Sequence, residues 1–307
     1  MDELKLPSYG GQAIIEGVLM RGEYAIAACM RAPDGNITIQ KEKLTGVYTS
    51  SIKKIPFLRG LLILWDALGL GVKYLTISAN VQTGEDEKLE GFSLYATLGF
   101  SLALSIVIFF LVPAAAIHWL QNPLGIDPWT GNLLEGMVRL ILIILYIWGI
   151  GQIPDIKRVF TYHGAEHKTI NAFEAGAELD PKTVKRYSLE HPRCGTSFIL
   201  IVMVFSLVGF ALIGPLPLGM RLLSRIILIP IIAGIAYEYI RWTSKNINNP
   251  VVRILSKPSM AMQKLTTREP SNEILEVAIS AFKSMYELEM EINPKFKSQP
   301  LAEGITV

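Results

Sequence analysis

The sequence predicts a mainly α-helical polytopic membrane protein, with about four transmembrane helices, one amphipathic or re-entrant helix and a small β-containing N-terminal unit. Half of the 307 residues are hydrophobic and only 18% are charged, whereas roughly a quarter are charged in a typical soluble domain. Long apolar stretches follow residue 90, while the N-terminal part carries short strand-like runs separated by turn residues.

Residues 1–54 predict a cytoplasmic β-hairpin unit. The runs 24–31 and 36–41 have strand composition, and Pro33-Asp34-Gly35 between them supplies turn chemistry. The preceding segment, 10–22, is an apolar run bounded by glycines and interrupted by Gln12, Glu16 and Arg21. It fits either a strand with a surface ion pair or a site loop that packs against a histidine cluster further along the chain.

Residues 55–90 predict an amphipathic helix followed by a solvated connector. Charged residues recur every seven positions at Arg59, Asp66 and Lys73, so they form one narrow polar stripe on an otherwise apolar helix. This pattern favours a helix that lies in the membrane interface or packs against the bundle. A spanning helix is the weaker alternative, because buried charges are costly in lipid. The charged run 85–88 marks the connector.

Residues 91–240 predict a bundle of four membrane spans. Apolar stretches long enough to cross about 30 Å of hydrocarbon run over about 94–117, 133–150, 198–213 and 222–240. The connectors 118–132 and 214–220 contain no Lys or Arg, whereas seven basic residues lie in the loop 151–197. Because basic loops stay in the cytoplasm, both termini and the 151–197 loop are expected on the cytoplasmic face of the membrane.

Residues 241–307 predict a cytoplasmic amphipathic tail. Apolar positions such as Ile274, Ala278 and Phe282 share one face of a helix over 272–291, and Pro270-Ser271 is a suitable helix start. The residues from 294 onward are expected to fray.

The main functional signal is a cluster of rare donor residues in the cytoplasmic loop. Three of the four histidines fall in two motifs, Tyr162-His163-Gly164-Ala165-Glu166-His167-Lys168 and Glu190-His191-Pro192-Arg193-Cys194-Gly195. On a helix, His163 and His167 project from the same face, with Glu166 on the same stripe. His-x-x-Glu-His is the inverted zinc-protease pattern, in which two imidazoles bind metal and the carboxylate is the base.

These motifs predict a divalent metal site, with zinc as the candidate ion. The expected ligands are His163, His167 and His191, with Cys194 as an additional ligand, and Glu166 is the expected general base. Residues expected to hold an anionic substrate or to line the site are Arg193, Lys168, Gln12, Glu16 and Arg21. Two alternatives stay open. The histidine pair can belong to a solvated surface face or to a hydrogen-bonded core, and the 191–195 segment can simply anchor the third span, with Cys194 as a small buried hydrophobe.

Four stretches in order along the chain resemble the YqhQ-like family of bacterial membrane proteins. They are the segment 11–22, Tyr162 to Thr169, His191 to Phe198, and Leu265-Thr266-Thr267-Arg268-Glu269-Pro270. The resemblance implies a domain of unknown function and a predicted metal-dependent enzyme, and it implies no substrate.

The sequence therefore supports a membrane-bound metal-dependent hydrolase of unknown substrate as the first hypothesis. A non-catalytic scaffold or assembly factor that binds another membrane protein or complex is the second hypothesis, and a transporter is the third. The lipid bilayer is the expected partner, and the near-balanced formal charge of +2 indicates no general affinity for nucleic acid. The pattern does not predict an oligomeric state.

Overall fold

The computed structural model describes residues 9–45, 55–83, 91–214 and 216–293. The expected connector 85–88 and the expected frayed end after 294 lie outside these residues. Helices dominate, and the strands form one antiparallel sheet of four strands in the order β1-β2-β3-β4. The strands are β1 (Gly10–Ile14), β2 (Gly17–Arg21), β3 (Ala25–Arg31) and β4 (Ile37–Lys43).

The sheet confirms the expected hairpin and divides the segment 10–22 into two strands. β3 and β4 pair across the turn at residues 32–36, while β1 and β2 pair across a turn at Ile15 and Glu16. Glu16 has a φ of 52°, in the left-handed region that glutamate rarely adopts. Its carboxylate is held by Arg158 and Tyr162, so tertiary contacts stabilise a turn that contains no glycine or proline.

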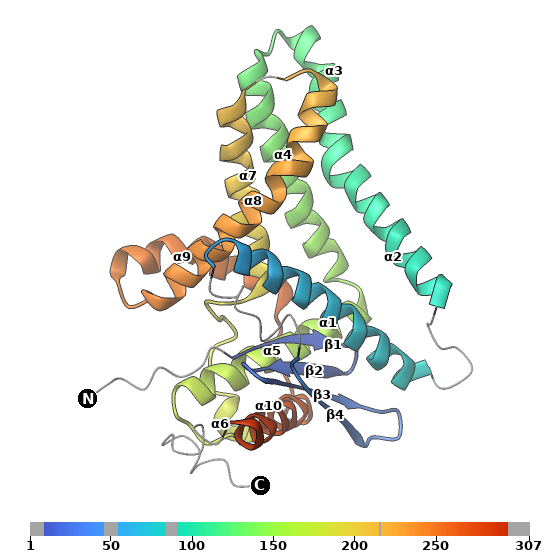
Figure 1. Cartoon of the computed structure of the whole chain (residues 1–307), viewed down its shortest axis with the longest axis vertical. Helices are drawn as coiled ribbons and strands as arrows, with labels where there is room; N and C mark the ends of the chain where they lie inside the picture. The colour runs from blue at the N-terminus through green and yellow to red at the C-terminus, as the bar shows by residue number, and fades with distance from the viewer. Residues whose placement is uncertain (1–8, 46–54, 84–90, 215, 294–307) are drawn as a thin grey trace.

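Both faces of the sheet are covered by helices. Ile14, Leu19 and Ile26 form one core with α1 (Leu58–Thr83), where Leu70 and Tyr74 pack against them. The alternate strand residues form the second core with α5 (Pro154–Glu174), the short helix α6 (Pro181–Val184) and α10 (Asn272–Ile292). The result is a three-layer unit with the sheet in the middle (Figure 1). Burial on both faces explains why β3 is an almost unbroken apolar run.

The expected amphipathic tail helix is α10, and Ser271 caps it by accepting a hydrogen bond from Ile274 N. Its apolar face, including Leu275, Phe282 and Met285, is buried against the protein's own sheet and α5. The amphipathic pattern therefore reports intramolecular packing, and it lends no support to the partner-binding interpretation that the sequence also allowed.

Helix α1 lies between the sheet and the helical bundle (Figure 1). Two residues of the polar stripe expected along it pair with neighbouring elements: Arg59 bonds to Glu238, and Lys73 Nζ donates to Glu42 Oε2 at 2.5 Å. The side chain of Asp66 lies outside the described part of the structure. Trp65 and Leu68, in contrast, are exposed on the remaining face. This arrangement agrees with a helix that packs beside the bundle and keeps one apolar face exposed.

The bundle extends away from the sheet (Figure 1), and four helical segments of the described chain form it. The first joins α2 (Gly91–Ile106), a π-helical turn (Val107–Leu111) and α3 (Val112–Leu124); the others are α4 (Pro128–Ile150), α7 (Gly195–Ile213) and α8 (Leu218–Lys245). By length and composition, three of the described helices are suited to cross a membrane: Gly91–Gln121, α4 and α7. Large apolar side chains such as Phe92, Phe100 and Leu212 are exposed along them, as expected for lipid-facing surface.

One charged pair is buried inside the bundle. Arg139, at the middle of α4, donates to Glu135 Oε1 at 2.7 Å and to the carbonyl of Phe109 at 3.0 Å. Phe109 lies in the π-helical turn, where the ordinary i to i+4 hydrogen-bond pattern is broken and a carbonyl becomes available to another helix. The pair therefore links the first span to α4.

The helix α9 (Pro250–Thr266), which the sequence analysis did not predict, connects the bundle to the three-layer unit. Its buried residues pack on α7, where Ser197 Oγ donates to Ser259 O at 3.1 Å. The extended segment after it leads to α10 and passes beside α5, since Arg268 N donates to Phe160 O at 3.0 Å. This course brings the end of α9 to the histidines of α5.

Candidate metal centre

Helix α5 carries both histidines of the first motif. Proline at its first position and Asp155 in its first turn suit a helix start, because the proline ring fixes a helical φ and the acid faces the positive end of the dipole. Four-residue spacing then brings the rings of His163 and His167 together, with centroids 4.4 Å apart.

Cys194 completes a compact group of three donors. One ligand atom from each of His163, His167 and Cys194 lies within 4.8 Å of the other two. The thiol reaches the site because Cys194 is the N-cap of α7, with its Sγ accepting from Thr196 N at 3.4 Å. Its Sγ lies 3.3 Å from His163 Nε2.

Backbone carbonyls fix the tautomer of both histidines. His163 Nδ1 lies 2.9 Å from Thr266 O, and His167 Nδ1 lies 2.5 Å from Leu189 O. A carbonyl only accepts, so each Nδ1 must carry the proton and each Nε2 keeps its lone pair. Histidines that bind a metal through Nε2 usually donate Nδ1–H to such a partner, which fixes the ring orientation. Two nitrogen donors and one sulfur donor with this support fit a zinc-like ion.

Glu166 lies beside the donor group in a buried position. Burial raises the pKa of its carboxyl to about 7, although the positive charge that His163 would carry if protonated, and a hydrogen bond from the Gly11 backbone, act in the opposite direction. Strand β1 passes so close to it that a Cβ on Gly11 would lie 3.0 Å from Glu166 Cδ. A carboxyl group with a pKa near neutrality is suited to general acid–base chemistry.

Gly164 allows the close contact that supplies the Thr266 carbonyl. A Cβ at this position would lie 2.1 Å from the carbonyl oxygen of Arg268 and 2.8 Å from Leu189 Cδ2. Only glycine therefore lets the segment after α9 approach α5 closely enough for Thr266 to reach His163.

His191 lies next to this group but faces a different partner. Its ring centroid is 5.8 Å from that of His167, and its Nε2 is 3.5 Å from Glu174 Oε2. Burial lowers the pKa of His191, and the charge of Arg193 adds to that effect, whereas the contact with Glu174 acts in the opposite direction. Among the described residues, the compact donor group contains Cys194 rather than His191.

Glu174 and Gln263 hold the 191–194 segment in place. Arg193 bonds to Glu174. Burial by itself would raise the pKa of Glu174, but the hydrogen bond with His191 and the charge of Arg193 outweigh burial, so the pKa of Glu174 is lowered. Gln263 accepts from His191 N at 2.9 Å and donates to His191 O at 2.8 Å. These two contacts fix the backbone from which Cys194 projects.

A small cavity of about 90 Å³ joins these groups. Glu166 and Arg193 both line it, together with Tyr9, Gly10, Gly11, His163, His167, His191, Cys194 and Gly195. Of the residues expected to contact a substrate, Arg193 is thus beside Glu166.

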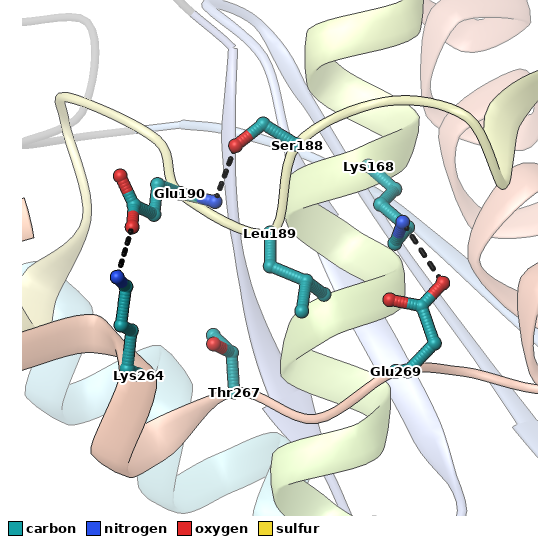
Figure 2. A pocket seen from close by; sticks show the side chains of 7 residues that line it. All are labelled: Lys168, Ser188, Leu189, Glu190, Lys264, Thr267 and Glu269. Carbon is teal, nitrogen blue, oxygen red and sulfur yellow. Dashed lines mark hydrogen bonds and ion pairs between the residues drawn. The ribbon is translucent and has the colours of Figure 1, made fainter. Parts of the chain in front are cut away.

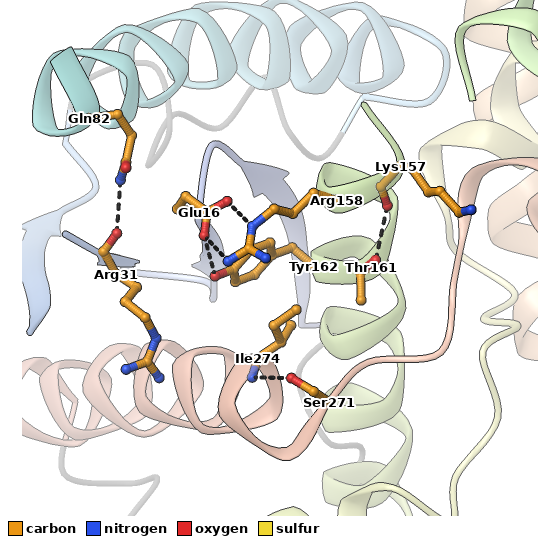
Figure 3. Close-up of polar contacts among 9 residues, drawn as sticks. All are labelled: Glu16, Arg31, Gln82, Lys157, Arg158, Thr161, Tyr162, Ser271 and Ile274. Atoms are coloured by element: carbon orange, nitrogen blue, oxygen red, sulfur yellow. Dashed lines mark hydrogen bonds and ion pairs between the residues drawn. The ribbon is translucent and has the colours of Figure 1, made fainter. Parts of the chain in front are cut away.

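Three other expected substrate contacts lie elsewhere. Gln12 packs against Gly71 of α1, on the opposite face of the sheet from Gly11, because strand residues alternate between faces. Arg21 lies near Tyr237 of α8. Glu16 is bound by Arg158, whose Nη2 donates to Oε2 at 2.6 Å, and by the Tyr162 hydroxyl (Figure 3).

Lys168 lines a second, open cleft of about 440 Å³ that borders the same segments (Figure 2). Its Nζ donates to Lys185 O at 2.7 Å and Tyr187 O at 2.8 Å, and it pairs with Glu269 at 3.0 Å. Lys168 thus ties α5 to the 185–190 segment, whose Leu189 carbonyl orients His167. The cleft is also lined by Ser188, Glu190, Lys264 and Thr267.

Several residues that support the site carry no recognisable sequence signal. Backbone carbonyls of Thr266 and Leu189 have no side-chain signature, and Gln263 belongs to a helix that no expected motif covers. The segment 265–270 offered the one available hint, since it is part of the family resemblance.

Comparison with known proteins identifies the family. A family described as "Protein of unknown function (DUF1385)" matches residues 55–288. The chain belongs to this family. It is also 36% identical over 298 residues to the "Uncharacterized protein YqhQ" of Bacillus subtilis (strain 168). The aligned region covers 92% of this chain and 93% of the relative. The YqhQ-like resemblance is thereby confirmed. No solved structure matches.

Both histidine motifs lie inside the part of the chain that the family covers. The family gives neither an activity nor a metal, so any function must be argued from the geometry of the site.

Proposed function

We propose that this protein is a membrane-embedded, metal-dependent hydrolase with His163, His167 and Cys194 as metal ligands. The observation that carries the proposal is the convergence of three donor atoms within 4.8 Å, two of them imidazole nitrogens whose lone pairs are left available by carbonyl-bound Nδ1–H groups. A metal in this group would supply a Lewis acid that makes water acidic enough to attack near neutral pH. His191 is then a neighbour of the ligands, positioned by Gln263 and Glu174.

Glu166 is the residue that would take and deliver the proton. It is buried in the same cavity as the donor group, and the hydrogen bond from the Gly11 backbone orients its carboxylate. Arg193 lines that cavity with a side chain held by Glu174, so it would orient an anionic group of the substrate. Lys168 and Glu16 contribute by fixing the segments around the site.

The setting of the site supports action at a membrane surface. The donor group lies where α5 of the three-layer unit meets the start of α7, one of the helices of the apolar bundle. With α8 as a fourth crossing, both termini fall on the same side as the site. The basic 151–197 loop favours the cytoplasmic face of a bacterial inner membrane.

The contact between Cys194 Sγ and His163 Nε2 also favours a second candidate, a thiol nucleophile activated by an imidazole base. The replacement Cys194→His separates the two candidates. A metal site still has three donors, now all nitrogen atoms, and retains its metal, whereas a thiol enzyme loses its nucleophile and all activity.

The test combines metal analysis with mutation. The purified protein is expected to carry one metal ion per chain, and His163→Ala and His167→Ala are expected to lose it. Glu166→Gln should keep the metal and lose hydrolysis of chromogenic ester, phosphoester and peptide substrates in vesicles. Protein that carries no stoichiometric metal, with a metal content unaffected by His163→Ala, would refute the proposal.

A further inference from the structure

Four of the five tryptophans mark two levels along the bundle. All five are exposed, and four lie near helix ends: Trp119 in α3, Trp129 and Trp148 in α4, and Trp242 in α8. Trp129 and Trp148 are nineteen residues apart, which is about 29 Å along a helix at ~1.5 Å per residue. This length matches the hydrocarbon core of a bilayer, and tryptophan concentrates at both of its interfaces.

Helix α9 starts eight residues after Trp242, at the tryptophan level nearer the sheet. In Figure 1, α9 and α1 both lie across the direction of the bundle, at the level where the bundle meets the rest of the protein. The fifth tryptophan, Trp65 of α1, is 78% exposed. Two helices thus lie at the depth expected for a membrane surface.

The residues of α9 separate into three rows along the helix. One row is buried against the protein: Val252, Ser256, Ser259, Met262, Gln263 and Thr266. The second row is exposed and apolar: Val251, Ile254, Leu255, Pro258 and Ala261. The third row is exposed and basic: Arg253, Lys257 and Lys264, spaced by four and seven residues. No acidic residue occurs in the helix.

We infer that α9 lies in the headgroup layer of an anionic bilayer, with the apolar row toward the acyl chains and Arg253 and Lys257 at the lipid phosphates. An exposed apolar row beside a basic row is the pattern of a helix that lies on a membrane rather than across it. The helix on which α9 packs, α7, is itself long and apolar enough to cross a membrane. The inference depends on the membrane plane and the α9 surface, and it does not depend on the metal proposal.

This position ties the membrane surface to the candidate metal centre. The last residue of α9, Thr266, supplies the carbonyl that orients His163, and Gln263 holds His191. A helix of 17 residues is about 25 Å long, so the site lies within one helix length of the lipid headgroups.

Fluorescence quenching by brominated lipid tests the inference on the full chain. A polarity-sensitive fluorophore is attached at Ile254→Cys, and separately at Leu255→Cys, in vesicles of brominated phosphatidylcholine and phosphatidylglycerol. Glu273→Cys on α10, which is exposed, is the matched water-facing control. The unmutated chain, whose two cysteines are buried, measures background labelling.

The inference predicts blue-shifted emission and strong quenching by bromine at positions 254 and 255, and neither effect at 273. Emission like that of the control, quenched by aqueous iodide, would overturn it. Blue-shifted emission without quenching by bromine would also overturn it, because a second copy of the chain would then cover the helix.

The basic row is tested by lipid composition. Each basic residue near an anionic surface contributes attraction of about fivefold in affinity. Quenching at position 254 should therefore weaken when phosphatidylglycerol is left out, and Arg253→Gln with Lys257→Gln should remove that dependence. Equal quenching in both lipid mixtures for the unmutated basic row would overturn the assignment of lipid phosphates as its partner.

Discussion

Replacement of Gly164 by alanine should weaken metal binding while the fold is retained. A Cβ at this position would lie 2.1 Å from Arg268 O, whereas ordinary contacts begin at 3.4 Å, so the segment after α9 must move by about 1.3 Å. Thr266 O, two residues earlier, is 2.9 Å from His163 Nδ1, and such a shift breaks that hydrogen bond. Loss of a carbonyl that orients a metal ligand typically costs roughly 10- to 100-fold in metal affinity.

Helix propensity alone predicts that Gly164→Ala stabilises the protein and gives no reason for weaker metal binding, so the experiment separates the two arguments. Alanine in a helix interior is more favourable than glycine by about 0.5–1 kcal/mol, so without the close contact Gly164→Ala would be stabilising. Gly69→Ala in α1 is the matched control, because nothing lies within 4 Å of its added Cβ. Metal affinity is measured by competition with a chromophoric chelator. Unchanged affinity in Gly164→Ala, as in the control, would refute the reasoning.

Three further predictions concern stability. Arg139→Leu should destabilise the bundle by about 3–5 kcal/mol, because it leaves Glu135 as a buried charge without its partner Arg139. The double variant Glu135→Leu with Arg139→Leu should be nearly as stable as the unmutated protein, and denaturant titrations in detergent measure both variants. Ser271→Ala should cost about 1 kcal/mol by removing the cap of α10, measured in the same way. Burial raises the pKa of Glu289, so its stabilising contribution is complete below the unfolded pKa of about 4.3 and is lost as pH rises through the higher folded pKa. Glu289→Gln should therefore flatten the dependence of the melting temperature on pH.

Each of these has a distinct contrary result. A double variant at 135 and 139 as unstable as Arg139→Leu would show that the ion pair itself stabilises the bundle. An unchanged midpoint for Ser271→Ala would show that the cap is dispensable. A melting temperature that rises with pH through the same interval in the unmutated protein would contradict the assigned direction for Glu289.

Local patterns predicted the elements that are built from regular periodicity. The hairpin of β3 and β4, three apolar spans and α10 each carry a complete signal within their own residues. The turn between β1 and β2 was missed because it uses Ile15 and Glu16, and the ion pair with Arg158 that stabilises it comes from residues 142 positions away. Helix α9 was missed because its exposed apolar row and its two prolines hide the periodicity of its buried face.

Only the part of the candidate site that lies on α5 could be predicted from the sequence. His163, Glu166 and His167 converge because of their spacing, whereas the third donor depends on how the 188–195 segment folds. The choice between His191 and Cys194 is made by Gln263, Glu174 and the start of α7, none of which a short motif encodes.

X-ray absorption spectroscopy at the metal edge of the purified protein tests the central claim most directly. The account predicts a first shell with one sulfur at about 2.3 Å and two imidazole nitrogens at about 2.0–2.1 Å, and loss of the sulfur in Cys194→Ser. A shell of oxygen atoms alone, or one that is identical in Cys194→Ser, would contradict it.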